Sequence, residues 1–273
     1  MRDNESIKKI QDKAIEILKA FIEVCEKLNL KYYVLGGTLL GAVRHKGFIP
    51  WDDDIDVGMP REDYEIFLQK ALDLLPQKYF VQSFKTDIEW PANFTKIRDS
   101  ETTFIETSVK NCKINHGLYI DVFPLDWHED NKFRLKIFNF KNKLYREAIG
   151  RSLYFEKSKR NWKWYIIRLL TMFTSTKTAL KKRDKLLMSN KGRTYLANYS
   201  GAWGEKEIVP FEWYGEGVEL EFEGLIVKAP TKYEKWLTQV YGDYMQLPPE
   251  EKRVTHHFSE VIDLEKSYKE YIK

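Results

Sequence analysis

The sequence contains little of what marks a secreted or membrane-spanning protein. It has only two cysteines, Cys25 and Cys112, which lie far apart in the chain and predict no disulfide framework. The first residues contain no apolar signal segment, and nowhere do 18 apolar residues run together. We therefore expect a protein that neither uses a signal peptide nor spans a membrane, and that works in the reducing cytoplasm.

Glycine, proline and repeated segments are also scarce. The 273 residues include 14 Gly and 9 Pro, 43% of all residues are hydrophobic, and no internal repeat or low-complexity run is visible. This composition is typical of a globular protein that buries a full core. The length fits one elaborated domain, or one domain with a helical subdomain.

Acidic residues are nearly absent from one long segment. Between Lys132 and Arg193 there are 19 Lys and Arg but only three acids, a local charge of +16, so the rest of the chain carries −12. Such a segment favours a polyanionic or anionic-surface partner. Its run of aromatic and cationic residues at 162–173 could lie in a membrane interface or pack as an ordinary helix, and we interpret 157–185 as a candidate membrane contact. Nucleic acid is not expected as a partner, because no recognition motif accompanies the charge.

A double glycine opens the most informative part of the sequence. Gly36, Gly37 and Thr38 follow a predicted strand at 32–35 and precede a predicted helix at 39–44. The glycines allow a tight turn close to a ligand, and Thr38 can cap the helix. Exposed amides at a helix start bind phosphate well, so this turn is a candidate phosphate site.

Carboxylates are concentrated in the segment that follows. Asp52, Asp54 and Asp56 alternate with other residues, so a strand here would place the three acids on one face and Ile55 and Val57 on the other. Carboxylates held so close repel one another unless a cation lies among them. Oxygen ligands suit a hard divalent ion, with Mg²⁺ as the first choice and Mn²⁺ as an alternative.

A further aspartate and several cations are candidates for the same site. Asp121 interrupts an otherwise apolar predicted strand, and a buried carboxylate is costly unless it is paired or bound to a metal. The alternative is that this aspartate caps the end of its strand. Arg44 and Lys46 could contact phosphate or merely neutralise the aspartates. Arg98 shares a predicted strand face with Lys96, and the two could face either the cleft or solvent.

The rest of the chain predicts helices and strands around this site. Apolar periodicity predicts helices at 5–28, 61–75 and 231–241, strands at 79–84 and 94–98, and a hairpin that turns at 223–224. An aromatic, proline-rich loop at 241–253 could form one wall of the cleft. At most one of the adjacent His256 and His257 can face the cleft, and His256 is the candidate for contact with phosphate or acceptor.

The stretch Gly36–Val57 resembles the signature of the LicD family, a branch of the nucleotidyltransferase superfamily that also includes the fukutin-related proteins. Residues 241–249 are similar to the second landmark of that family. The resemblance implies a nucleotidyltransferase-like mixed β-sheet core, so we expect an α+β fold in which helices flank this core. The helical and basic pattern from 131 to about 190, which no motif of the family covers, predicts a basic helical insertion. We expect 1–130 to form the catalytic core, 131–200 the basic helical subdomain, and 201–273 the part that completes the core and the active-site wall.

The resemblance also implies an activity. Family members transfer a phosphoalcohol, typically phosphocholine from CDP-choline, to a sugar hydroxyl of teichoic acid, lipopolysaccharide or a related surface glycan, with Mg²⁺. The expected partners are a CDP-alcohol donor and a glycan or lipid-linked oligosaccharide acceptor. Carried over to this sequence, Asp54 and Asp56 would bind the metal, with Asp52 adjoining. Asp121 would activate the acceptor hydroxyl or complete the metal shell, and the double-glycine turn would hold the donor phosphates, while Arg44 or Arg98 would stabilise the leaving cytidine phosphate.

Three other interpretations stay open at this stage. A calcium loop of the EF-hand type is disfavoured because Val57 and Asp63 stand where that loop has Gly and Glu. A nucleotidyltransferase that attaches a nucleotide to a small molecule would release pyrophosphate instead of CMP. A glycan-binding module without catalysis would keep its properties after replacement of Asp54.

Overall fold

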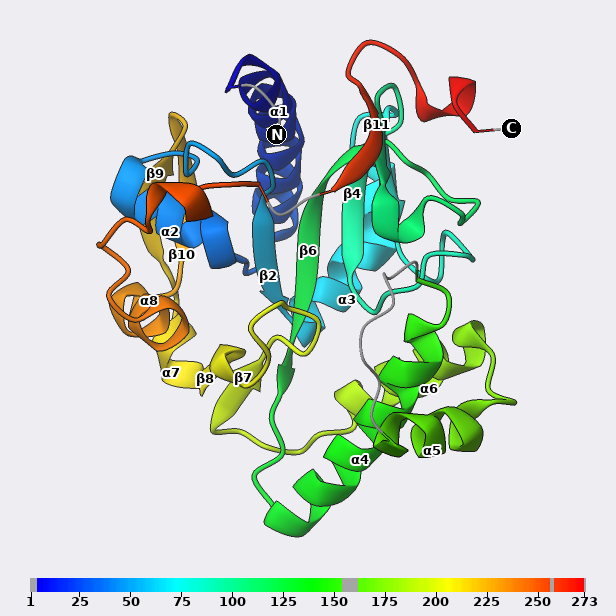
Figure 1. The fold of residues 1–273 in the computed structure, drawn as a ribbon. Coiled ribbons are helices and arrows are strands. Elements are labelled where there is room, and N and C mark those ends of the chain that lie inside the picture. The colour runs from blue at the N-terminus through cyan, green and yellow to red at the C-terminus, as the bar shows by residue number, and fades with distance from the viewer. Residues whose placement is uncertain (1–3, 154–161, 256–257, 273) are drawn as a thin grey trace.

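The computed structural model describes residues 4–153, 162–255 and 258–272 (Figure 1). Its architecture is α+β, as predicted, with a mixed sheet at the centre of the molecule. The strands of this sheet are β1 (Tyr33–Val34), β2 (Asp56–Pro60), β3 (Tyr79–Gln82), β4 (Thr95–Asp99), β6 (Leu118–Trp127), β7 (Tyr195–Ala197) and β8 (Ile208–Pro210). The order is β1-β2-β6-β4-β3, and β7 joins β8 to β6. The pair β2–β6 is parallel, whereas β1–β2, β4–β6 and β3–β4 are antiparallel.

Helices α1 (Asn4–Leu28) and α3 (Arg61–Lys70) cover one face of this sheet. The apolar stripe predicted for the first helix is buried, including Cys25, and Phe21 on α1 meets Phe67 on α3 edge to face. Because strand side chains alternate, Ile120 and Val122 face these helices while Asp121 between them faces the other way. The core therefore fixes which side of the sheet carries the acids.

A second group of elements packs beside β1 and β2. It consists of α2 (Gly36–His45), α7 (Phe211–Tyr214), β9 (Val218–Phe222), β10 (Leu225–Ala229) and α8 (Tyr233–Tyr241). The hairpin predicted at 223–224 is confirmed: Glu223 and Gly224 both have positive φ, as a two-residue hairpin loop with the favoured twist requires. Phe48 stacks at an angle on Phe222, so the hairpin braces the loop that leads to the acidic segment.

The basic segment folds into helices α4 (Lys132–Gly150), α5 (Trp162–Thr171) and α6 (Thr176–Met188), which gather at one end of the sheet (Figure 1). Ala148, Ile149, Ala179 and Leu180 form a small core of their own between α4 and α6. Arg61 joins α6 to the sheet, because it pairs with Asp126 on β6 and Asp184 on α6. The boundaries 1–130, 131–200 and 201–273 stay predictions.

Two further strands, β5 (Thr103–Glu106) and β11 (Ser259–Asp263), form a separate antiparallel pair near the C-terminal end. In the described parts of the chain, no helix combines the length and the hydrophobicity that crossing a bilayer requires.

Candidate active site

The first turn of α2 is built against two carboxylates. A Cβ atom at Gly36 would lie 2.8 Å from Oδ2 of Asp56, and one at Gly37 would lie 2.3 Å from Oδ2 of Asp52. Gly36 also has a positive φ of 54°, which other residues adopt at a cost. The double glycine is therefore needed for a close approach, and the groups that approach it in this structure are protein carboxylates. The positive end of the helix dipole stabilises their charge.

Thr38 does not cap α2, contrary to the prediction. The helix starts earlier than expected, at Gly36, and Leu35 occupies the N-cap position. The buried hydroxyl of Thr38 instead accepts a hydrogen bond of 2.8 Å from the backbone N–H of Asp56. The N–H of Leu35 donates to the carbonyl of Asp56 at 2.9 Å. These two bonds fix the start of β2 to the start of α2.

The strand prediction for the acidic segment is correct only at its end. Strand β2 starts at Asp56, and Asp52–Ile55 precede it without regular secondary structure. One carboxylate oxygen from each of Asp52, Asp53 and Asp54 lies within 4.8 Å of the other two, so a loop brings the acids together where alternation along a strand was expected. Asp53, which sequence reasoning left out, is buried and accepts a hydrogen bond of 2.7 Å from the hydroxyl of Thr255.

Asp121 lies beside Asp56 across the sheet, because the two residues are partners in the parallel β2–β6 register. On its other side, Nζ of Lys96 on β4 lies 2.8 Å from Oδ1 of Asp121 and 3.3 Å from Oε1 of Glu106. Burial raises the pKa of Asp121; Lys96 opposes this effect, and the charges of Glu106 and Asp54 add to it. The carboxyl of Asp121 therefore holds a proton more readily than an ordinary aspartate.

Arg98 is fully buried on the same strand face as Lys96, as predicted, but it does not line the cavity described below. Its guanidinium donates to Gln82, to the carbonyl of Gly117 and to Glu106. Burial alone would raise the pKa of Glu106, but the adjacent Lys96 and Arg98 lower it to about 2. The position of Arg98 does not support the expectation that it contacts a donor phosphate. Its guanidinium lies outside the cavity and pairs with the carboxylate of Glu106.

A cavity of about 900 Å³ opens onto the carboxylates. Four segments contribute to it: the start of α2 with the acidic loop, the sheet, the loop after β7, and the predicted wall after α8. Its lining includes Gly36, Gly37, Arg44, Trp51, Asp52, Asp54, Asp56, Phe94, Asp121, Phe123, Asn198, Trp203, Glu207, Tyr241, Asp243, Tyr244, Pro248, Pro249 and Lys252. Residues that are more than 200 positions apart in the sequence therefore meet around one space.

Seven of the candidate residues line this cavity: Gly36, Gly37, Arg44, Asp52, Asp54, Asp56 and Asp121. Arg44 is held in place by a hydrogen bond of 2.9 Å from Nη1 to the carbonyl of Tyr244. Lys46 lies outside the cavity, largely exposed, with its Nζ 3.6 Å from Glu221. Thr38 does not line the cavity either, and His256 lies outside the described residues.

Sequence reasoning missed the part of the cavity contributed by the segment after β7. Glu207 is buried there and accepts hydrogen bonds from the backbone N–H of Trp203 and from Nδ2 of Asn198. Burial raises its pKa to about 7. Trp203 meets Tyr241 edge to face, with ring centroids 4.9 Å apart. In the sequence, Glu207 follows two charged residues and gives no sign of burial, whereas the Gly- and Trp-rich composition of 199–204 does mark the loop as unusual.

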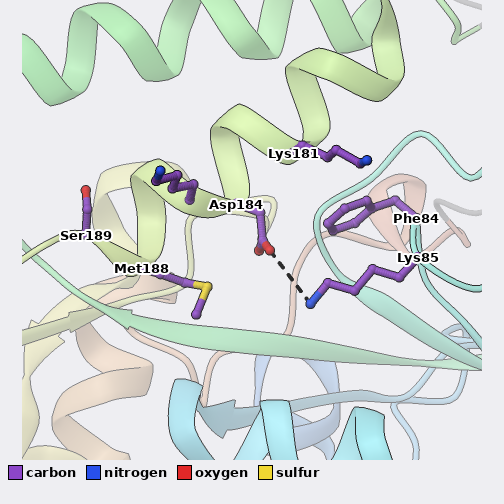
Figure 2. A pocket seen from close by; sticks show the side chains of 7 residues that line it. Phe84, Lys85, Lys181, Asp184, Met188 and Ser189 are labelled. Carbon is purple, nitrogen blue, oxygen red and sulfur yellow. Dashed lines mark ion pairs between the residues drawn. The ribbon is translucent and has the colours of Figure 1, made fainter.

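A second cavity, of about 450 Å³, lies between α6 and the residues after β3 (Figure 2). It is lined by Phe84, Lys85, Lys181, Asp184, Lys185, Met188 and Ser189. Its one carboxylate, Asp184, already pairs with Arg61 at 3.2 Å and with Lys85 at 3.9 Å. The dashed line in Figure 2 marks the ion pair between Asp184 and Lys85. Of these two cavities, only the first combines several carboxylates with room for a ligand.

Comparisons with known proteins identify relatives of this chain. Residues 29–163 match the family model described as LicD/FKTN/FKRP, nucleotidyltransferase domain. Over 269 residues the chain is 32% identical to the lipopolysaccharide cholinephosphotransferase LicD of Haemophilus influenzae, a match that covers 92% of this chain and 95% of that protein. It is 37% identical over 129 residues to an uncharacterized protein of Rickettsia typhi, covering 46% of this chain and 39% of that one.

A shorter match links the chain to a human protein. Over 48 residues it is 44% identical to the ribitol 5-phosphate transferase FKRP of Homo sapiens, covering 18% of this chain and 10% of that protein. The near full-length match to the Haemophilus protein confirms the predicted family and the predicted enzyme class. The chain therefore belongs to the LicD family and is a phosphotransferase.

Proposed function

We propose that this enzyme transfers phosphocholine from CDP-choline to a sugar hydroxyl of a cell-surface glycan such as lipopolysaccharide or teichoic acid. The observation that carries the proposal is the first cavity, in which Asp52, Asp54 and Asp56 meet Asp121 of the neighbouring strand beside the first turn of α2. A site for phosphoryl transfer needs this concentration of oxygen ligands, because catalysis depends on positioning and on neutralising the phosphate charge.

The residues present fit a hard divalent cation, Mg²⁺ first and Mn²⁺ as the alternative. All four carboxylates line the cavity and offer oxygen ligands alone, and the missing side chains of Gly36 and Gly37 leave the space that two of them occupy. We assign Asp54 and Asp56 as the main ligands with Asp52 adjoining, whereas the buried Asp53 supports the loop through Thr255. When bound, the ion would polarise the diphosphate and offset the charge that develops on it.

The transfer breaks the bond between the phosphocholine phosphorus and the bridging oxygen, which leaves with CMP. The acceptor hydroxyl oxygen forms the new bond to that phosphorus and loses its proton. Asp121 is placed to take this proton, because it lines the cavity and its raised pKa makes it a better base than an ordinary aspartate. Lys96 orients the carboxylate of Asp121. Arg44 supplies positive charge for the departing phosphate of CMP.

Two properties of the cavity favour choline among the phosphoalcohols. The lining includes the aromatic rings of Trp203 and Tyr241, which meet edge to face. Tyr241 lies near the acidic loop: burial raises the pKa of its hydroxyl, and the charges of the nearby aspartates raise it further. Aromatic faces and carboxylates attract quaternary ammonium groups, and a neutral polyol such as ribitol lacks this cation–π attraction. The Haemophilus relative is named as a cholinephosphotransferase, and it matches nearly the whole chain.

We place the reaction in the cytoplasm, with a glycan or a lipid-linked oligosaccharide as the acceptor. Both cysteines are free and Cys25 is buried, which fits a reducing compartment. The main alternative function is the attachment of a nucleotide to a small molecule, which the same carboxylates could serve.

The test measures CMP release from CDP-choline in the presence of a glycan acceptor, together with transfer of labelled choline. We expect the D54N and D56N variants to lose about 10²–10³-fold in turnover while they keep the fold. Asp12, an exposed acid of α1, provides the matched control, and D12N should retain full turnover. Release of pyrophosphate from a nucleoside triphosphate, with no CMP from CDP-choline, would instead establish the alternative. A panel of CDP-choline, CDP-ethanolamine, CDP-glycerol and CDP-ribitol tests the choice of alcohol.

A further inference from the structure

Helix α5 and the turn that follows it leave large apolar side chains in solvent. The exposed residues are Tyr165, Ile166, Leu169, Leu170, Met172 and Phe173, which together we call the α5 face. Phe173 is 93% exposed and Leu169 is 66% exposed. Residues 165 and 169 are four apart and follow one side of α5, 166 and 170 follow the adjacent row, and 172 and 173 lie in the turn after the helix. Soluble surfaces rarely carry so much contiguous apolar area without a partner.

The position of this face is fixed by the surrounding chain. The guanidinium of Arg151, at the end of α4, donates to the carbonyls of Thr171, Met172 and Thr174 just after α5. The hydroxyl of Thr171 donates to the carbonyl of Ile167 at 2.9 Å. The bonds from Arg151 satisfy the carbonyl of Thr171 at the end of α5 and two carbonyls of the turn that follows. The exposed Phe173 therefore lies within a turn that hydrogen bonds hold in place, including the bond from the N–H of Thr174 to the carbonyl of Thr171.

The segment of sequence that carries the α5 face has charge of one sign. The sequence contains no Asp or Glu between residues 157 and 183, although it contains nine Lys and Arg there. Among the described side chains, Arg168 on α5 and Lys177, Lys181 and Lys182 on α6 are exposed. The residues 157–161 lie outside the described part of the chain. An apolar helix face with cations and no acids has the pattern of an interfacial helix.

We propose that the α5 face docks on the surface of an anionic lipid bilayer, with its apolar side chains at the level of the headgroups and the neighbouring cations against lipid phosphates. Helix α5 has ten residues and is therefore about 15 Å long. It is too short to cross a hydrocarbon core of about 30 Å, so it lies along the surface.

Charge and chemistry argue against two other occupants. A second copy of the chain in a symmetric contact would bring the same patch of both copies together, and with it two segments of charge +16. A nucleic acid would pair with the cations but would leave the leucines and Phe173 without apolar contacts. An anionic membrane interface matches both the apolar and the basic part of the surface.

The proposal goes beyond the proposed function and does not depend on it, because no residue of the α5 face lines the first cavity. The experiment is sedimentation of the full-length protein with vesicles of phosphatidylcholine alone, and with vesicles containing 30% phosphatidylglycerol. The test variant is L169E/F173E. The control is I226E, which places a single acid at an exposed apolar residue of β10, away from the α5 face. A second variant, K177E/K181E, tests the basic component.

We expect wild type and I226E to sediment with the anionic vesicles and not with phosphatidylcholine alone. L169E/F173E should bind at least about tenfold more weakly, and K177E/K181E should lose at least about fivefold for each lysine whose charge is reversed. CMP release from soluble CDP-choline should be the same in all four proteins, which separates a failure of this proposal from a failure of the proposed function. Equal sedimentation of L169E/F173E and wild type would overturn the proposal. A lipid-free dimer of wild type that L169E/F173E converts to monomer would also overturn it and would identify a second copy as the occupant.

Discussion

The replacement of Gly37 by alanine tests how the structure holds Asp52. A Cβ atom at this position would lie 2.3 Å from Oδ2 of Asp52, whereas non-bonded heavy atoms prefer a separation of about 3.5 Å. The carboxylate must therefore move by roughly 1 Å, and a displacement of this size in an active site can lower the rate by about 10²-fold. Alanine is favoured over glycine inside a helix by about 1 kcal/mol, so G37A should not unfold the protein.

The assay is CMP release from CDP-choline, with circular dichroism and urea unfolding as checks on the fold. The matched control is G150A, which introduces the same methyl group in helix α4 where no atom lies within 4 Å of the new Cβ. If the loss arises from displacement of Asp52, the double variant G37A/D52A should be no slower than D52A alone. A G37A enzyme with wild-type turnover would refute the reasoning.

Three further predictions concern the charged groups of the site. K96M leaves Asp121 and Glu106 buried without their shared cation, so it should lower the free energy of unfolding in urea by about 3–5 kcal/mol, and a change below about 1 kcal/mol would contradict the assigned pairing. Burial raises the pKa of Glu207 to about 7, so the folded state holds this proton more tightly than the unfolded state does. The resulting contribution to the free energy of unfolding is fully present below about pH 4.5 and is lost as the pH rises through 7. The loss amounts to roughly 3 kcal/mol. Urea unfolding at pH 5 and pH 8 should show that E207Q removes this difference in the free energy of unfolding. The same difference in E207Q and wild type would exclude Glu207 as its source. R44A should raise the KM for CDP-choline about tenfold or more through loss of a charged phosphate contact, and an unaltered KM would remove Arg44 from donor binding.

The sequence was informative wherever a local rule determined the outcome. The periodic apolar residues of α1 predicted a helix that the structure contains, and the lone acid in the apolar strand around Asp121 indicated a special position. The double glycine does mark a close approach, but to the carboxylates of Asp52 and Asp56, and its contact with a ligand phosphate stays a prediction. In these cases the physical reason lies within a few residues of the chain.

The sequence could not predict features that depend on distant partners. The alternation of acids at 52–56 is compatible with a strand, yet the loop geometry that gathers Asp52, Asp53 and Asp54 depends on contacts such as the bond from Gln11 to the carbonyl of Asp52. Arg98 and Lys96 share a strand face, but only the fold shows that Glu106 is between them.

Helix geometry separates the two neighbouring cations of α2 in the same way. Arg44 lies within the last turn and lines the first cavity, whereas Lys46 follows the helix end in a left-handed conformation, with a φ of 56°, and lies outside the cavity. The sequence places both cations just before the acidic segment, and only the fold shows that one lines the cavity while the other lies outside it.

The central claim is that the carboxylates of the first cavity hold a divalent cation. The most direct measurement is Mn²⁺ binding followed by electron paramagnetic resonance, with wild type compared with D54N/D56N and with the surface control D12N. We predict that wild type and D12N bind Mn²⁺, that Mg²⁺ displaces it, and that D54N/D56N loses the site while it keeps its fold. Equal Mn²⁺ affinity in wild type and D54N/D56N would contradict the account.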